Sequence, residues 1–434
     1  MALLTPSLSK SFSSLQEMPN KTSRTFHLNP KILMSLTDSA IAKPTSFVAE
    51  PTEKKTGFGF KNFTGTFFMN VKRAEGRLME TVNLRVPAIT GGTEVDQIEN
   101  VAIRVELRNG FVGWGEALVV PTVGRAAAVE KVTAACEFLR RCPAMTLDSV
   151  LDEIENLLPG HEFSSVRSGV EMALIDAAAN SINVPLWRLF GGCSNSLSTS
   201  ITIPIRSPEE TFRVVSKYSS KGFKAFRLNI GKDLDSEMEA FRAVRSANRK
   251  CTVILDANEA YSPPQALQLL DRLQGKGGDP PVVLEQPVKG KDMEGLRQVH
   301  ERAREMKGAV VIGVDEGCKN ITEAHRIIRE RVADVINLKL SKFGVIGSLE
   351  LIEAAKIAGF ELMIEGSLET RLATGFAGHL AAGLGCFKYV ALDGPFMQLE
   401  DPIIGGYEVG GSVYKFTNSR GQGGFLKWHV DVSP

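Results

Sequence analysis

The chain has 434 residues, of which 43% are hydrophobic and 23% charged, and its formal net charge is +1 at pH 7. This length and composition allow a large buried core and more than one domain. No stretch approaches the roughly 18 uncharged apolar residues that a membrane helix needs, and so small a net charge gives no long-range attraction for nucleic acid. We therefore expect a globular protein with a small-molecule substrate, and neither a membrane nor a nucleic acid as partner.

The first 59 residues differ in composition from the rest of the chain. Serine and threonine are interspersed there with lysine and arginine, and acidic residues are few. This composition is typical of an organelle transit peptide, although a plain disordered tail shares much of it. We predict a chloroplast transit peptide over residues 1–59. The alternative is a disordered leader on a cytoplasmic protein.

Residues 60–193 predict an α+β domain. Its β-rich runs begin near Gly65, and Asn109-Gly110 is a strong hairpin-turn signal between two of them. Helical stretches follow, the last two with apolar residues at spacings of three and four: RAAAVEKVTAACEFLRR, LDSVLDEIENLLP and SSVRSGVEMALIDAAANS. We expect this domain to cap the one that comes next.

Residues 194–396 repeat a pattern of strand, loop and helix. The interval is about 25 to 30 residues, as one βα unit of a TIM barrel requires. The predicted strands lie in STSITIPI, KAFRLNI, CTVILDAN, PVVLEQP, AVVIGVDEG, VINLKLS, ELMIEGS and KYVALDG. Ser207-Pro208 and Ser262-Pro263 indicate helix starts, with a capping serine before a proline. The prediction is an α/β fold with a modified (β/α)7β barrel, and residues 397–434 pack back on the capping domain.

The ends of four successive barrel strands carry chemically active side chains. These side chains are Asp256 in the motif LDAN, Glu285 in LEQP, Asp315 in VDEG and Lys339 in NLKLSKFG. Active sites of such barrels lie at the carboxyl ends of the strands, where these residues would converge. Each acid alone could simply cap the next helix. Three carboxylates with open positions for water and substrate suit Mg²⁺ rather than zinc.

These residue types fit the removal of a proton next to a carboxylate. The product of that step is an enediolate with two negative charges, which a nearby cation makes accessible. Lys339 is the candidate base, because an ammonium near a metal ion and away from water has a lowered pKa.

The order LDAN, LEQP, VDEG and NLKLSKFG, preceded by GVEMALIDAAANSINVPLWRLFGG, resembles the muconate-lactonizing subgroup of the enolase superfamily, and within it the dipeptide epimerases. The resemblance covers about residues 65 to 430. It implies Mg²⁺ on Asp256, Glu285 and Asp315 and a catalytic base at Lys339. We also expect a homo-oligomer.

The second strand departs from the family pattern. The subgroup carries Lys-x-Lys there, whereas this chain reads Arg227-Leu228-Asn229. Arg227 keeps the charge of the first lysine, but its guanidinium stays protonated and cannot serve as a base. Asn229 replaces the acid/base that would face Lys339 across the substrate, and an amide cannot deliver the second proton.

Further residues are expected to touch the substrate. Asp393 matches the second acid of the family's Asp-x-Asp, which holds the amino group, although it could be an ordinary turn residue. Glu369 in GSLETRL matches a recurrent family position, or is merely an acid in a first helical turn, and Ser367 precedes it. The loop from Pro87 to Asn100 contains Thr93 but no lysine or arginine, which disfavours an acidic substrate side chain.

The leading hypothesis is a Mg²⁺-dependent isomerase, a dipeptide epimerase that performs 1,1-proton transfer on L-Ala-Xaa or an N-acyl amino acid, with Xaa not acidic. One alternative is a lyase or cycloisomerase that needs only Lys339, which Asn229 favours. Another is a metal-binding homologue without turnover. A dehydratase of the mandelate-racemase type is disfavoured, since Glu365 stands after the seventh strand where that type has a histidine.

Overall fold

The computed structural model describes residues 59–90, 93–273, 282–306 and 310–428. The predicted transit peptide, residues 1–59, lies outside the described residues except for Gly59. Within the described ranges, none of the helices combines the length and the apolar composition that crossing a bilayer requires.

Eight parallel strands form one sheet whose spatial order follows the chain. They are β9 (Ile201–Ile203), β10 (Ala225–Asn229), β11 (Thr252–Asp256), β12 (Val282–Glu285), β13 (Val310–Val314), β14 (Val335–Leu338), β15 (Glu361–Glu365) and β16 (Tyr389–Ala391). The backbone N–H of Ser200 donates to the carbonyl of Val390 at 2.8 Å, which brings the first and last strands together. This nearly closed barrel confirms the predicted fold class.

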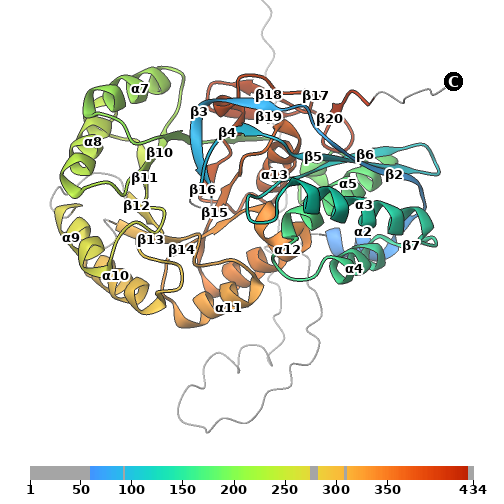
Figure 1. The fold of residues 1–434 in the computed structure, drawn as a ribbon, viewed down its shortest axis with the longest axis horizontal. Coiled ribbons are helices and arrows are strands. Elements are labelled where there is room, and N and C mark those ends of the chain that lie inside the picture. Colours follow the sequence, from blue (N-terminus) through green and yellow to red (C-terminus); the bar gives the residue numbers. More distant parts are fainter. Residues whose placement is uncertain (1–58, 91–92, 274–281, 307–309, 429–434) are drawn as a thin grey trace, which may run out of the picture. The chain divides into compact units, whose positions relative to one another are not determined.

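A helix follows each of the first seven strands. They are α7 (Pro208–Ser220), α8 (Leu234–Ala247), α9 (Pro263–Leu273), α10 (Met293–Glu305), α11 (Ile321–Glu330), α12 (Leu340–Ala358) and α13 (Arg371–Leu384). Figure 1 shows α7 to α11 around the outside of the strands. Ser207 caps α7 as predicted, accepting from the N–H of Glu210 at 3.2 Å. Ser262 instead bonds through its hydroxyl to the Gln265 side chain at 2.7 Å.

The N-terminal region combines a three-stranded antiparallel sheet, a hairpin and helices. The sheet has the order β2 (Val71–Leu78), β5 (Val101–Leu107), β6 (Val112–Ala117), and the hairpin pairs β3 (Val82–Thr90) with β4 (Thr93–Ile98). The short strands β1 (Phe68–Met69) and β7 (Met145–Thr146) pair with each other. The helices are α2 (Phe60–Thr66), α3 (Arg125–Arg141), α4 (Leu147–Leu157), α5 (Ser164–Ser181) and α6 (Leu186–Leu189).

The end of the chain returns to the N-terminal sheet. After α14 (Gly394–Met397) it forms β17 (Ile403–Gly405), β18 (Tyr407–Gly410), β19 (Val413–Phe416) and β20 (Gly424–Leu426), with β19 pairing β8 (Ser196–Ser198). The Trp428 indole donates to Glu75 of β2 at 3.0 Å and lies edge-on to Trp114 of β6. The Trp428 side chain thus ties the last described segment to the first sheet.

Strand β6 lies unusually close to helix α5. A Cβ on Gly115 would overlap the carbonyl oxygen of Gly169, and one on Gly113 would overlap the backbone of Ala173 and Ala177. Only glycines allow this approach, because the obstructing atoms are backbone atoms that cannot rotate away. The neighbouring Glu116 of β6 accepts from the backbone N–H of Thr370 at 2.9 Å, which connects the sheet to the start of α13.

We predict that Gly115→Ala lowers the free energy of unfolding by about 2–4 kcal/mol, since the added methyl must displace the α5 backbone. The matched control is Gly65→Ala in α2, where nothing lies within 4 Å of the added atom, and its effect should stay within about 1 kcal/mol. Urea unfolding followed by circular dichroism measures both. Equal effects at the two sites would contradict the close approach of β6 and α5.

Candidate active site

Four buried carboxylates lie at the carboxyl ends of the barrel strands. Asp256, Glu285 and Glu365 end β11, β12 and β15, and Asp315 directly follows β13. Their exposed fractions are 2%, 0%, 9% and 4% in that order. The structure therefore brings together the three acids predicted from the sequence and adds Glu365. Strand alternation could have found Glu365, because it ends β15 just as Asp256 and Glu285 end their strands.

Arg227 of β10 stands among three of these acids. Its Nη2 is 2.7 Å from Asp256 Oδ2, its Nε 3.1 Å from Glu285 Oε2, and its Nη1 3.0 Å from Glu365 Oε1. Burial disfavours the charged guanidinium, but the surrounding carboxylates outweigh this and raise the pKa of Arg227 well above its ordinary value. Arg227 is thus a fixed cation, which supports the expectation that it cannot act as a base.

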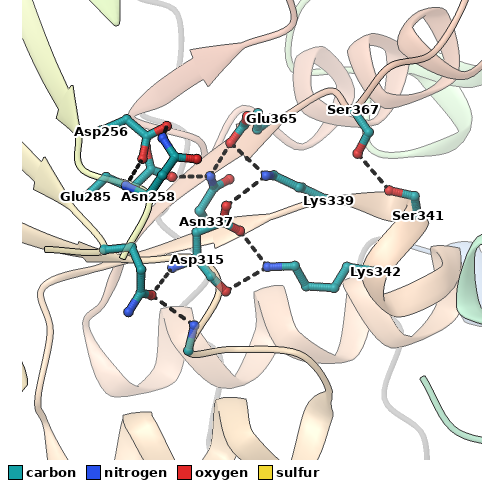
Figure 2. Close-up of polar contacts among 12 residues, drawn as sticks. Asp256, Asn258, Glu285, Asp315, Asn337, Lys339, Ser341, Lys342, Glu365 and Ser367 are labelled. Carbon is teal, nitrogen blue, oxygen red and sulfur yellow. Dashed lines mark hydrogen bonds and ion pairs between the residues drawn. The ribbon is translucent and has the colours of Figure 1, made fainter. Parts of the chain in front are cut away.

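Lys339 lies between two carboxylates, as Figure 2 shows. Its Nζ is 2.8 Å from Asp315 Oδ2 and 3.2 Å from Glu365 Oε2. Lys342 contacts the other oxygen of Asp315 at 2.5 Å. Although burial alone would raise it, these two lysines hold the pKa of the Asp315 carboxyl well below its usual range.

Without a metal ion, burial and the neighbouring carboxylates together set the pKa of Lys339. Burial lowers it, but Asp315 and Glu365 outweigh burial and raise the pKa of the Lys339 ammonium well above its ordinary value. A divalent ion bound to the same carboxylates would weaken their pull on the ammonium, because its charge offsets theirs. The pKa of Lys339 therefore depends on whether these carboxylates also bind a cation.

Two asparagines also belong to the site. The Asn337 side chain, fully buried in β14, donates to both Glu285 and Glu365. Its Oδ1 has no hydrogen-bond partner among the described residues, and the same holds for the buried Oδ1 of Asn229. Asn337 was not among the predicted site residues, although strand alternation points it to the same side as Lys339 two residues later. Each of these amide oxygens is therefore a buried hydrogen-bond acceptor that the described residues leave unsatisfied.

A cavity of about 400 Å³ opens over this cluster. Arg227, Asn229, Lys339 and Glu365 line its charged and polar floor. Apolar residues of the β3–β4 hairpin, of barrel loops and of α14 line much of the rest, among them Leu84, Ile98, Ile205, Ile230, Leu368 and Met397. The predicted loop over the barrel mouth is thus a hairpin that closes one side of the cavity. Asn229 and Lys339 face the same space.

Two of the four predicted substrate-binding residues line the cavity, and the other two do not contribute to its described lining. Asp393 and Ser367 line the cavity; Asp393 accepts from the backbone N–H of Thr202 at 2.6 Å, and the hydroxyl of Ser367 bonds to that of Ser341 at 2.9 Å (Figure 2). Glu369 is buried behind Ser367, and burial, together with Glu116, raises its pKa to about 8. The side chain of Thr93, the first residue of β4, lies outside the described part of the chain.

Helix α5 of the N-terminal region supports the turn that carries Lys339. Lys339 is the N-cap of α12, which bends at Gly344, where φ is +75°. A Cβ on Gly344 would come within 2.9 Å of the Glu171 carboxylate, and Glu171 accepts from the N–H of Val345. The hydroxyl of Ser164, also in α5, donates to the carbonyl of Ser341 at 2.8 Å. Position 344 therefore needs a glycine. The next residue, Val345, has a buried side chain and no left-handed backbone, so a glycine is not required there.

The sequence matches two family models. "Mandelate racemase / muconate lactonizing enzyme, N-terminal domain" covers residues 74–191, and "Enolase C-terminal domain-like" covers residues 211–423. An L-Ala-D/L-amino acid epimerase of Populus trichocarpa is 50% identical over 374 residues, which are 86% of this chain and 88% of the relative.

Solved structures of similar proteins share the fold. A substrate-liganded L-Ala-D/L-Glu epimerase from Bacillus subtilis superposes with a TM-score of 0.75 at 28% identity, over 82% of this chain and 99% of that one. A dipeptide epimerase from Enterococcus faecalis, complexed with Mg and L-Leu-L-Tyr, gives a TM-score of 0.72 at 24% identity, with shares of 82% and 99%.

Glu171 predicts a pH dependence of stability. Burial raises the pKa of its carboxyl from 4.5 to about 7, although Arg167 and backbone N–H groups act against this. The protonated form is therefore favoured by folding: its stabilising effect is complete below pH 4.5 and is lost as the pH rises through 7. We expect the free energy of unfolding of the native chain to fall, relative to Glu171→Gln, by on the order of 3 kcal/mol between pH 5 and 8.

Urea unfolding at several pH values measures this difference. Exposed Glu162→Gln, in the turn before α5, is the control and should run parallel to the native chain. Parallel curves for Glu171→Gln as well would show that Glu171 carries no such dependence.

Proposed function

The chain belongs to the mandelate racemase and muconate lactonizing enzyme family of the enolase superfamily, and from this premise we propose that it is a Mg²⁺-dependent dipeptide epimerase. The reaction moves the proton on the α-carbon next to the carboxylate of an L-Ala-Xaa dipeptide. The observation that carries the proposal is the position of Lys339 at the floor of the cavity, 2.8 Å from a buried carboxylate of the acidic cluster.

The residues present fit a hard divalent cation. Glu285, Asp315 and Glu365 each offer a carboxylate oxygen within 4.8 Å of the others, Asp256 ends the neighbouring strand, and carboxylate and amide oxygens are the ligands that Mg²⁺ prefers. When bound, the ion supplies positive charge that stabilises the substrate's carboxylate as negative charge develops on it.

Lys339 is the base of the proposed reaction. Its Nζ lies at the cavity floor, where it can take a proton from a carbon held above the carboxylates. Lys342 shares Asp315 with it and therefore reduces the negative charge that would otherwise hold the Lys339 proton. Arg227 keeps its proton throughout and acts as a fixed positive charge below the substrate.

Among the described residues that line the cavity, no second base stands opposite Lys339. Asn229 lines the cavity and can orient a water molecule or a substrate group, but it has no proton to exchange near neutral pH. Inversion then depends on solvent delivering the proton, and we expect epimerisation to be slower than exchange. This observation also favours a second candidate, a lyase or cycloisomerase that needs one base only.

The cavity lining favours an apolar side chain at the second substrate residue. Its walls carry leucine, isoleucine and methionine, and its two basic side chains, Arg227 and Lys339, both contact carboxylates. An acidic Xaa would find no free cation among the described lining residues, so Xaa is not acidic.

We also propose a plastid location and a homo-oligomeric assembly. The composition of residues 1–59 and the plant source of the Populus trichocarpa relative support a plastid location. The homo-oligomer stays a prediction, which sedimentation of the purified protein would test.

Proton NMR in D₂O tests the function directly. With Mg²⁺ and L-Ala-L-Phe or L-Ala-L-Leu, we expect deuterium at the α-carbon of the second residue, and at least about tenfold less with L-Ala-L-Glu. Lys339→Ala should reduce exchange by a factor of about 10² to 10⁴, because it removes the base. Absence of exchange with every dipeptide tested would refute the proposed activity.

A second prediction concerns the missing base. Asn229→Lys places an ammonium on the side of the cavity opposite Lys339, so the ratio of inversion to exchange should rise by about tenfold or more. Asn229→Gln, which adds length but no exchangeable acid, is the control. The ratio follows from the D₂O spectra together with chiral chromatography of the product, and an unchanged ratio would mean that Asn229 does not face the reacting carbon.

A further inference from the structure

A second cavity, of about 560 Å³, lies at the amino ends of the barrel strands and shares no lining residue with the cavity over the acidic cluster. Residues at the starts of four strands line it: Ser200 before β9, Lys224 before β10, Thr252 at the start of β11 and Lys388 before β16. Because β9 and β16 are the first and last strands of the sheet, this amino-end cavity lies at the seam of the barrel. Its volume is that of an ordinary small-molecule site.

The charged side chains of the amino-end cavity are all basic. Lys221, Lys224 and Lys388 line it, and its described lining includes no aspartate or glutamate. Lys388 is paired with Glu361. Lys221 and Lys224 form no ion pair with a carboxylate in the described part of the chain, and the Lys221 ammonium lies 5.6 Å from the centre of the Tyr218 ring. Two positive charges at this cavity are therefore left without a carboxylate partner.

A buried hydroxyl without a partner lines the same cavity. Ser200 is 1% exposed, and its Oγ has no hydrogen-bond partner among the described residues. Leaving a buried hydroxyl unsatisfied is unfavourable. The neighbouring Thr199 shows the contrast, since its hydroxyl donates to the carbonyl of Ser200 at 3.0 Å and accepts from the N–H of Leu392 at 2.8 Å. A ligand with an acceptor oxygen in the amino-end cavity would satisfy Ser200.

The turn between β18 and β19 fixes one wall of the amino-end cavity. The hydroxyl of Ser412 in this turn donates to the carbonyl of Gly222 at 3.0 Å, and its backbone carbonyl accepts from the N–H of Thr199 at 2.9 Å. Gly411 has a φ of +61°, and a Cβ there would come within 2.1 Å of the carbonyl oxygen of Lys221. Backbone contacts therefore hold the segment that carries the unpaired lysines against the end of the chain.

Part of the lining is apolar. Leu197, Ile254, Phe387 and Val413 contribute to it. A bare inorganic ion would leave this surface uncovered, whereas a ligand with an organic part would remove it from water, which is favourable. The cavity therefore matches an organic anion better than a bare ion.

We propose that the amino-end cavity binds a small organic phosphate ester, with Lys221 and Lys224 as its cations and Ser200 as a hydroxyl donor. A phosphate monoester carries about −1.5 to −2 charges near neutral pH and offers three strong acceptor oxygens. This matches two unpaired ammonium groups and one unsatisfied hydroxyl. The organic part of the ligand contacts Leu197 and Phe387. The site is independent of the proposed function, because it uses no residue of the acidic cluster.

Calorimetric titration of the full chain tests this site. The protein is freed of metal with EDTA and dialysed, so that no metal ion binds the probe, and is then titrated with phenyl phosphate, inorganic phosphate or benzoate. The variants are Lys224→Gln and Ser200→Ala. Lys61→Gln, which removes an exposed lysine of α2, controls for the loss of positive charge. Lys339→Ala removes a basic side chain from the other cavity and reports binding there.

We expect Lys224→Gln to weaken the binding of phenyl phosphate by about tenfold or more, because a hydrogen bond between charged groups is lost. Ser200→Ala should weaken it by about threefold to tenfold. Lys61→Gln and Lys339→Ala should change it by less than about twofold, since charges far from the site are screened. Inorganic phosphate, which lacks the apolar part, and benzoate, which carries one charge only, should both bind more weakly than phenyl phosphate.

Urea unfolding of Ser200→Ala separates a ligand contact from a structural role. Removing an unsatisfied hydroxyl should leave the free energy of unfolding unchanged or raise it, while the affinity for phenyl phosphate falls. A loss of stability in this variant with unchanged affinity would refute the role of Ser200.

Other results would overturn the site itself. These are no binding of phenyl phosphate at millimolar concentration, equal affinity in the native chain and Lys224→Gln, or loss of binding in Lys339→Ala, which would put the phosphate in the other cavity. Benzoate or inorganic phosphate binding as tightly as phenyl phosphate would refute the assignment to a phosphate ester.

Discussion

The repulsion among four carboxylates buried at one end of a barrel is the constraint on which the site depends. Such a group is stable only if cations are placed within it, because water cannot screen charges there. The chain supplies Arg227 from β10 and Lys339 and Lys342 from the segment after β14. The acids thus fix where the cations lie, and the cations fix which carboxylate oxygens remain for a metal ion and a substrate.

The N-terminal region takes part in this arrangement from outside the barrel. Its α5 approaches β6 through paired glycines on one side and, on the other, offers Glu171 to the turn that begins α12. Its hairpin contributes Leu84 and Ile98 to the cavity wall. The N-terminal region, which contains none of the four acids, therefore both supports the turn that carries Lys339 and shapes the cavity.

The barrel and three of its acids could be predicted from the sequence. The strands recur at a regular interval, and Asp256, Glu285 and Asp315 stand at their carboxyl ends. The side-chain contacts within the site could not be predicted. The sequence shows that Arg227 replaces a lysine. It does not show that the guanidinium contacts three acids, because this depends on which side chains lie within its reach across the barrel. The position of Glu365 at a strand end is visible in the sequence, but its contacts with Arg227 and Lys339 are not, because these residues lie near the ends of other strands, far away in the chain. The raised pKa of Lys339 also depends on those partners.

The contact between α5 and the start of α12 also bears on how such a protein can diverge. In such a two-domain arrangement, residues of the N-terminal region could determine substrate specificity while residues of the barrel alone position the proposed base. Here Ser164 and Glu171 fasten the Lys339 turn to the same polypeptide stretch whose hairpin covers the cavity. Exchange of the cap between relatives would therefore also replace the contacts that position Lys339, the proposed base, so that specificity and the position of this lysine are inherited together.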